Sequence, residues 1–308
     1  DSTTSKEMAT RVIFLSQTII GIFGNFSILY HYLFFPHSEF RLSFRHFILK
    51  HLMIANSLVI LSTGVPQTLR ALGLKYFFSD VGCSLLFYVQ RLGRGMSIVT
   101  TCFLSVFQTI MISPMNSKWK DLKVKVPEYI GCSIPFCWSL DILVNFIVSA
   151  YTFIKLSSKN ITKKDLGYCS TLGHDKILNS LYIALFVFPE VLFSGLIILS
   201  SSWMIFILYR HKQQVQHIHR TNVSSTSSPE SRAIQSILVL VTTFVSFNTF
   251  TSIFYACIAV LYNPSWWLMN TTTLIALCFP TVSPFVLMSH DSTISRLCFL
   301  RVRNRKFP

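Results

Sequence analysis

The sequence predicts an all-α fold in which seven helices cross a membrane. Only 13% of its 308 residues are charged, whereas soluble domains average about 25%. Hydrophobic residues make up 51% of the chain and the mean hydropathy is +0.52. These values exclude a disordered chain, and eight cysteines are too dilute for a small disulfide-stapled domain. The net charge of +15 does not indicate nucleic-acid binding, because too few polar residues are present to form a water-soluble surface.

Seven apolar stretches have the length that a membrane-crossing helix needs, about 20 residues. Lipid offers no partner for a free backbone N–H or C=O group, so each stretch is expected to be helical. Residues 237–262, for example, do not alternate between polar and apolar side chains as a membrane strand would. The expected spans are residues 9–35, 46–70, 80–112, 127–152, 177–209, 233–262 and 266–288. We assign residues 1–288 to one seven-helix domain and residues 289–308 to a tail.

The individual spans differ in the polar residues and prolines that they carry. The first span is longer than the apolar region of a signal peptide, so we expect no cleavable signal. The third span contains Arg91 and Arg94, the fourth Asp141, and the fifth Pro189 and Glu190. The sixth span has no proline, so no proline kink is expected there. Charges and prolines inside the spans are typical of helices that pack in a bundle rather than of lone anchors.

The distribution of Lys and Arg predicts that the N-terminus is outside and the C-terminus cytoplasmic. With this orientation, the inner segments hold 16 of the 27 basic residues and the outer segments hold nine. An excess of basic residues marks the cytoplasmic side. The outer loop 153–176 weakens the signal, because it carries five Lys.

Two features of the outer loops agree with this orientation. The tripeptide Asn160-Ile161-Thr162 is an acceptor sequence for N-glycosylation, although such tripeptides also occur by chance. Cys83 begins the third span and Cys169 lies in the loop before the fifth, so both face the oxidising side, where disulfides persist. We expect a Cys83–Cys169 disulfide that holds the loop over the mouth of the bundle; two free thiols are the alternative.

Local motifs along the chain indicate a family. Seven helices, an outer N-terminus and this cysteine pair are similar to the pattern of G-protein-coupled receptors. Further segments, spread along nearly the whole chain, are GVPQTLRALG (64–73), LSVFQTIMISP (104–114), NITKKDLGYCS (160–170), RHKQQVQHIH (210–219), SPESRA (228–233) and CFPTVSPFVLM (278–288). These segments resemble the vomeronasal type-1 receptor family. The resemblance implies a seven-transmembrane-helix bundle of the G-protein-coupled receptor type.

The chain departs from the wider rhodopsin-like pattern in ways that vomeronasal type-1 receptors share. Asn56 stands where the wider pattern has a carboxylate that helps to hold sodium, so a sodium site is doubtful. Gln108 lies near the position of the usual arginine at the end of the third helix, and two ways of counting disagree by one residue. Ser283-Pro284 stands where Asn-Pro is usual. These departures support the resemblance.

Four ionisable residues lie well inside the spans and are the candidate ligand contacts: Arg91, Arg94, Asp141 and Glu190. Charged groups are costly inside a membrane and are therefore functional candidates, and these four sum to zero. At a rise of ~1.5 Å per residue they lie roughly 12 to 20 Å below the outer face, on the third, fourth and fifth helices. They could therefore line the outer half of one cavity.

We expect Arg91 to pair with Glu190 across this cavity, because an unpaired charge is expensive in a low dielectric. An ion pair that only holds the bundle together, without touching ligand, is the alternative. Asp141 could instead turn outward, since the fourth helix often lies at the periphery. Pro189 would free a carbonyl group and bend the fifth helix, either as a signalling element or as an adaptation of packing.

The expected cytoplasmic face is strongly basic and is the candidate output surface. Its basic clusters are residues 118–125, 210–214 and 296–306. We expect Gln108, Arg210 and Lys212 to face a G protein, while attraction to anionic lipid is the alternative role of the basic residues. Cys298 follows the last span closely and is a candidate for palmitoylation.

The resemblance implies a pheromone receptor of the plasma membrane. It would bind a small organic ligand, volatile or steroid-like, in the outer half of the bundle and activate a heterotrimeric G protein of the inhibitory type. Membrane lipids are further partners; we expect no nucleic acid, cofactor or metal. The alternatives are a bitter-taste-type chemoreceptor and, in a different class, a small-solute transporter or channel. An enzyme is not expected, because H-E-x-x-H, G-x-S-x-G and P-loop motifs are missing from the sequence.

Overall fold

The computed structural model confirms an all-α bundle with seven helices that are long and apolar enough to cross a membrane. It describes residues 2–34, 40–74, 79–114, 117–156, 163–165, 170–172, 183–218, 229–260 and 265–290. The seven spans agree with the sequence prediction in number and order. The chain is therefore a multi-pass membrane protein.

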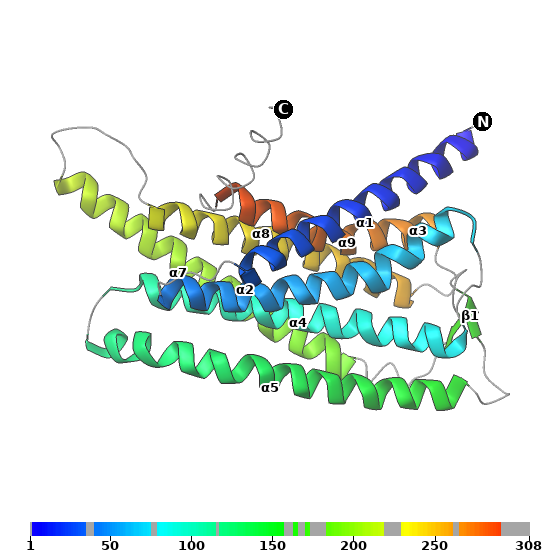
Figure 1. Cartoon of the computed structure of the whole chain (residues 1–308), viewed down its shortest axis with the longest axis horizontal. Helices are drawn as coiled ribbons and strands as arrows, with labels where there is room; N and C mark the ends of the chain where they lie inside the picture. Colours follow the sequence, from blue (N-terminus) through cyan, green and yellow to red (C-terminus); the bar gives the residue numbers. More distant parts are fainter. Residues whose placement is uncertain are drawn as a thin grey trace.

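The elements run mostly along one common direction (Figure 1). In chain order they are α1 (Ser2–Phe34), α2 (Phe40–Val59), the π-helical turn η1 (Ile60–Gly64), α3 (Val65–Ala71), α4 (Asp80–Ile112), α5 (Ser117–Leu156), β1 (Lys163–Asp165), β2 (Ser170–Leu172), the π-helical turn η2 (Ile183–Val187), α7 (Phe188–Ile218), α8 (Pro229–Val260) and α9 (Trp266–His290). The N-terminus and β1 lie at the same end of the bundle, which we call the N-terminal face. The other end is called the opposite face.

Prolines explain the two π-helical turns. The second span consists of α2, η1 and α3, and η1 ends two residues before Pro66. In the fifth span, η2 ends two residues before Pro189. Proline has no N–H group and its ring clashes with the carbonyl four residues earlier, so the helical hydrogen bonds shift to a wider spacing there. The sequence analysis expected a bend at Pro189, and the structure places the π-helical turn η2 just before this residue.

At the opposite face, two helices extend beyond the predicted spans. α5 begins at Ser117 instead of residue 127, and α7 continues to Ile218 instead of residue 209. Hydropathy marks only the part of a helix that suits lipid, whereas lysine and glutamine are good helix formers in water. The basic stretch 118–125 is consequently helical, and within it the Nζ atom of Lys123 donates a hydrogen bond of 2.6 Å to the carbonyl of Ser113.

The segment between α5 and α7 contains a hairpin that the sequence did not predict. β1 and β2 are antiparallel, with Lys163 opposite Leu172 and Asp165 opposite Ser170. Each strand is three residues long, which is too short to show an alternating pattern in the sequence. The hairpin lies at the N-terminal face and contacts α5 through β2.

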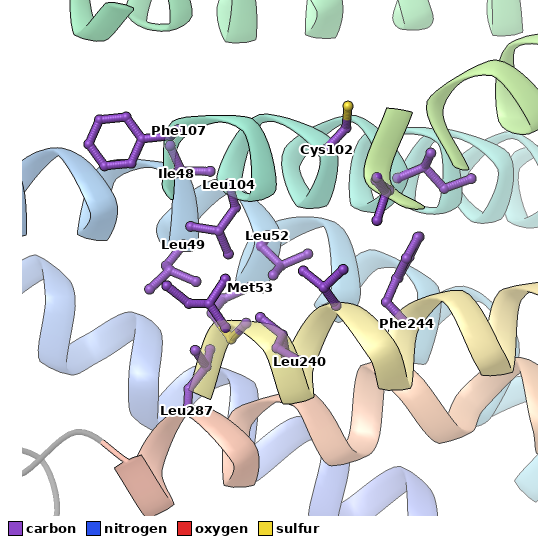
Figure 2. Packing of buried hydrophobic residues seen from close by; sticks show 14 of the residues in the cluster. Ile48, Leu49, Leu52, Met53, Cys102, Leu104, Phe107, Leu240, Phe244 and Leu287 are labelled. Atoms are coloured by element: carbon purple, nitrogen blue, oxygen red, sulfur yellow. The ribbon is translucent and has the colours of Figure 1, made fainter. Parts of the chain in front are cut away.

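The main hydrophobic core is built around α2, α4, α8 and α9, and buried residues of α1, α5 and α7 also belong to it. Figure 2 shows Leu52 and Met53 of α2 beside Leu104 of α4, with Leu240 of α8 and Leu287 of α9 on the other side. α4 also packs closely against α5 and α7, so it contacts more of the other spans than a peripheral helix does. Side chains on different sides of α4 therefore reach different neighbouring helices.

Close packing of α4 against α2 depends on Gly93. A Cβ atom at Gly93 would lie only 2.8 Å from the backbone carbonyl oxygen of Ala55. Backbone atoms cannot move aside as the end of a flexible side chain can, so an alanine would push the helices apart. Gly195 of α7 is different, because a Cβ atom there meets nothing within 4 Å.

We predict that Gly93→Ala lowers the free energy of unfolding by roughly 1–3 kcal/mol, the usual cost of overpacking. Gly195→Ala is the matched control and should change it by less than about 1 kcal/mol, the difference in helix propensity. Thermal unfolding of the two purified variants in detergent measures both effects. Equal behaviour of the two variants would show that α2 and α4 do not pack as closely as described.

Candidate functional site

An ion pair joins the third and fifth spans inside the bundle. The Nη2 atom of Arg94, on α4, lies 2.6 Å from Oε1 of Glu190, on α7. The side chains are 24% and 16% exposed, so both charges are largely withdrawn from the surface. The hydroxyl of Ser252, on α8, donates to the same carboxylate oxygen at 2.9 Å. The guanidinium also lies 5.0 Å from the centre of the Tyr255 ring, which is within cation–π range.

The expected pairing of Arg91 with Glu190 is wrong, because Arg94 takes this role. Arg91 instead donates hydrogen bonds to residues of α5: Nε to Oδ1 of Asn145 at 3.1 Å, and Nη2 to the hydroxyl of Ser149 at 2.5 Å. Three residues correspond to 300° of helical rotation, so the two arginines point about 60° apart. That rotation is enough to direct them to different neighbouring helices.

Asp141 faces the interior of the bundle, so the alternative that it turns outward is wrong. Its Oδ1 atom accepts a hydrogen bond of 2.8 Å from Nδ2 of Asn145. A Cβ atom at Gly95 would lie 2.9 Å from Oδ2 of Asp141, so the glycine of α4 makes room for this carboxylate. The Oδ2 atom is buried and has no hydrogen-bond partner within the described part of the chain. Among the described residues, Asp141 therefore keeps one acceptor atom without a donor.

One cavity brings together all four ionisable residues that the sequence singled out. It has a volume of about 200 Å³, and Arg91, Arg94, Asp141 and Glu190 are among its lining residues. We call it the side cavity. Its walls come from α4, α5, the turn η2 and the first turns of α7, and Phe193 contributes an aromatic surface. The polar groups thus converge on a largely apolar space, which is the usual composition of a small-molecule site.

A second, smaller cavity of about 50 Å³ lies between α4, α8 and α9. We call it the central cavity. Arg94 lines both cavities, and the central one also includes Gln90 and Tyr255, whose amide and hydroxyl groups lie 3.4 Å apart. The Arg94–Glu190 ion pair therefore stands between the two cavities. A group that displaced either partner in the side cavity would also alter the wall of the central one.

Asn145, Ser149, Ser252 and Tyr255 are site residues that the sequence analysis missed. Asn145 and Ser149 follow Asp141 at intervals of four residues, so they lie on one face of the helix. Polar residues at that spacing beside an intramembrane charge could have identified them. Ser252 and Tyr255 carry no comparable signal, because the sixth span contains several other hydroxyl residues.

A neutral network occupies the position where the wider receptor pattern has its sodium-binding carboxylate. Asn56 of α2 accepts a hydrogen bond of 3.0 Å from the hydroxyl of Ser97, on α4. Its Nδ2 atom donates to the hydroxyl of Ser283, on α9, at 2.9 Å. The three side chains join three spans by uncharged hydrogen bonds.

Only some of the remaining predicted site residues lie in the part of the chain that the structure describes. Cys83 is disulfide-bonded, while its expected partner Cys169 lies outside the described residues, as do Asn160 and Cys298. Gln108 is only 8% exposed, so it does not reach the surface in this conformation. Arg210 is exposed on α7; Lys212 lies on the same helix, but its side chain is outside the description.

Comparison with known proteins settles the family. The sequence model of the vomeronasal organ pheromone receptor family matches residues 8–300. The chain belongs to this family. It is 50% identical to vomeronasal type-1 receptor 4 of Homo sapiens over 297 residues, 95% of this chain and 99% of that receptor. It is 51% identical to vomeronasal type-1 receptor 2 of Homo sapiens, across 95% of this chain and 75% of that one. A relative from Mus musculus, vomeronasal type-1 receptor 45, is 33% identical over 91% of this chain and 88% of its own length.

Membership in the vomeronasal pheromone receptor family decides between the sequence-based alternatives. The resemblance to vomeronasal type-1 receptors is confirmed, and the bitter-taste alternative falls away. The family consists of receptors rather than enzymes or transporters.

We predict that thermal unfolding will identify Arg94 as the partner of Glu190. Glu190→Gln leaves the Arg94 charge inside the bundle without its counter-ion and should lower the free energy of unfolding by roughly 1–3 kcal/mol. Adding Arg94→Gln removes the second charge and should restore part of that loss. Arg91→Gln is the matched control, and its effect should add independently to that of Glu190→Gln. Strong coupling of Glu190 to Arg91, with none to Arg94, would contradict the described pairing.

Proposed function

We propose that this member of the vomeronasal receptor family is a pheromone receptor of the plasma membrane that binds a small organic ligand in the side cavity. Ligand binding activates a heterotrimeric G protein of the inhibitory type. One observation supports the ligand site most: the four ionisable residues that the sequence places well inside the spans all line one cavity between α4, α5 and α7. Charges are kept inside a membrane when they serve a function. The names of the relatives, vomeronasal type-1 receptors, support the receptor function.

The ion pair supplies a route from the ligand to the helices. Glu190 is held by Arg94 of α4 and by Ser252 of α8. α7 packs closely against α4, and α8 against α9, whereas α7 and α8 have far fewer contacts with each other. A ligand that hydrogen-bonds to Glu190 or Arg94 would weaken the link to Ser252 and let α8 move with α9. It favours the moved state only by the difference between its affinities for the two states.

The G protein binds at the opposite face in this proposal. The helical extensions of α5 and α7 carry basic residues there, among them Lys120 and Arg210. Gln108 is buried at the same end of α4, so it becomes accessible only when the ends of the helices separate. A basic, opened surface suits an acidic segment of a G-protein α subunit.

The N-terminal face is extracellular in this proposal and the C-terminus is cytoplasmic. The excess of basic residues at the opposite face supports this orientation. The disulfide at Cys83 agrees with it, since disulfides persist on the oxidising side. We propose Cys169 as its partner, Asn160 as a glycosylation site and Cys298 as a palmitoylation site.

We predict that side-cavity variants lose ligand-driven signalling. Cells expressing the chain with an inhibitory-type G protein are screened with volatile and steroid-like compounds. For a compound that activates the chain, Arg94→Gln and Asp141→Asn should raise the half-effective concentration by about tenfold or more, the loss of one charge-assisted hydrogen bond. Leu143→Ala is the control, because Leu143 is 56% exposed on α5 and does not line the cavity.

Surface expression of every variant is measured in the same cells, so that poor folding is separated from poor binding. Robust signalling that survives Arg91→Ala combined with Glu190→Ala would overturn the proposed site. Loss of signalling in the Leu143→Ala control at normal expression would do the same, because that residue lies outside the cavity.

We predict that Asn160 carries a glycan. Asn160→Gln should lower the apparent mass on a gel. Treatment of the chain that keeps Asn160 with a glycosidase should give the same shift. Asn222 is the matched control: Asn222-Val223-Ser224 is also an acceptor tripeptide but lies on the proposed cytoplasmic side. A mass shift for Asn222→Gln and none for Asn160→Gln would reverse the proposed orientation.

A further inference from the structure

We propose that the ligand reaches the side cavity from the bilayer, through a lateral opening between α5 and α7. This inference rests on the proposed function, because it supplies the access route of that ligand site. It replaces entry from the aqueous side, which a mouth at the N-terminal face would suggest. It also restricts the ligand to molecules that partition into membranes.

The first observation is how the three helices around the cavity pack. α4 packs along α5 on one side and along α7 on another. Within the described parts of α5 and α7, these two helices make few close contacts with each other. Both nevertheless supply walls of the side cavity, α5 through Leu140 and Val144 and α7 through Pro189 and Phe193. Within the described residues, the side of the cavity away from α4 is therefore bounded only by side chains of α5, η2 and α7.

The second observation is the exposure of those side chains. Leu140 lines the cavity and is also 50% exposed, so it spans the boundary between the cavity and the outside of the bundle. The flanking surface is apolar on both helices, with Phe136 exposed on α5 and Phe188 and Leu192 exposed on α7. An exposed apolar surface at the depth of the spans faces lipid acyl chains rather than water. The opening therefore leads into the hydrocarbon.

The third observation is the polarity of the cavity from its mouth to its back wall. The apolar lining residues Leu140 and Val144 come from α5, and Pro189 and Phe193 come from α7. Arg94 belongs to α4, Glu190 is paired with it, and Asp141 lies against Gly95 of α4. These polar groups therefore form the back wall of the cavity, on its α4 side. At that back wall, the buried Oδ2 atom of Asp141 has no partner in the part of the chain that is described. This gradient suits a molecule that leaves the bilayer with its polar group leading and its apolar body following. A strongly hydrated ligand would instead have to cross hydrocarbon to enter.

The side cavity suggests the probe with which to test this route. Its volume of about 200 Å³ exceeds the roughly 150 Å³ that accommodates benzene in an engineered protein cavity. We therefore choose 3-trifluoromethyl-3-phenyldiazirine, a small lipophilic compound that reacts with nearby residues on illumination. Its ring-sulfonated analogue has a similar shape but stays in water. The full-length chain is reconstituted in phosphatidylcholine nanodiscs, illuminated with each probe and mapped by mass spectrometry.

We expect the lipophilic probe to label the side-cavity residues Val144 and Phe193 at least about tenfold more than the sulfonated probe does, as its partition into hydrocarbon requires. Leu140→Trp places a larger side chain in the opening and should reduce this labelling by about tenfold or more. Leu143→Trp is the matched control on the lipid-facing side of α5 and should leave the labelling within about twofold.

Other outcomes separate the access route from the site. Equal labelling of the side cavity by both probes would overturn lateral entry while supporting the proposed site. Unchanged labelling in Leu140→Trp would also overturn this opening. Labelling that is confined to Tyr255 and Phe279 of the central cavity, with none in the side cavity, would overturn the site and the route together.

Discussion

The ion pair between Arg94 and Glu190 is the interaction on which the arrangement of the bundle interior depends. Each charge alone would be costly at this depth, because lipid and protein solvate ions poorly. Pairing at 2.6 Å offsets much of that cost, and it requires α4 and α7 to lie side by side at one register. The hydroxyl of Ser252 joins α8 to the same carboxylate. The need to neutralise these two charges thus holds α4, α7 and α8 at one relative register.

The same constraint organises the interface between α4 and α5. Arg91 and Asp141 are connected through Asn145, which accepts from the arginine and donates to the carboxyl group. Gly95 allows the close approach of Asp141 to α4. Further into the bundle, Asn56 uses only neutral hydrogen bonds to link α2, α4 and α9. Charge is therefore concentrated beside the side cavity.

The sequence predicted the number of spans and four residues that line the side cavity, but not which residues pair. Hydropathy and the cost of intramembrane charge are local properties, so they identified Arg91, Arg94, Asp141 and Glu190 without knowledge of packing. Whether Arg94 or Arg91 pairs with Glu190 depends on how α4 is rotated about its axis. The estimate of depth from the number of residues contains no information about this rotation. The helical start of α5 at Ser117 was missed because hydropathy detects lipid-facing residues only. The lateral opening follows from the spacing of two helices and has no signal in either sequence segment.

A ligand-bound structure determined in lipid nanodiscs tests the central claim most directly, namely that the charged cluster between α4, α5 and α7 is the ligand site. The account predicts ligand density between α4, α5 and α7, within hydrogen-bond distance of Arg94, Glu190 or Asp141. It also predicts that the hydrogen bond from Ser252 to Glu190 is lengthened or lost in that complex. Ligand density elsewhere in the bundle, with the Arg94–Glu190–Ser252 contacts intact, would contradict the account.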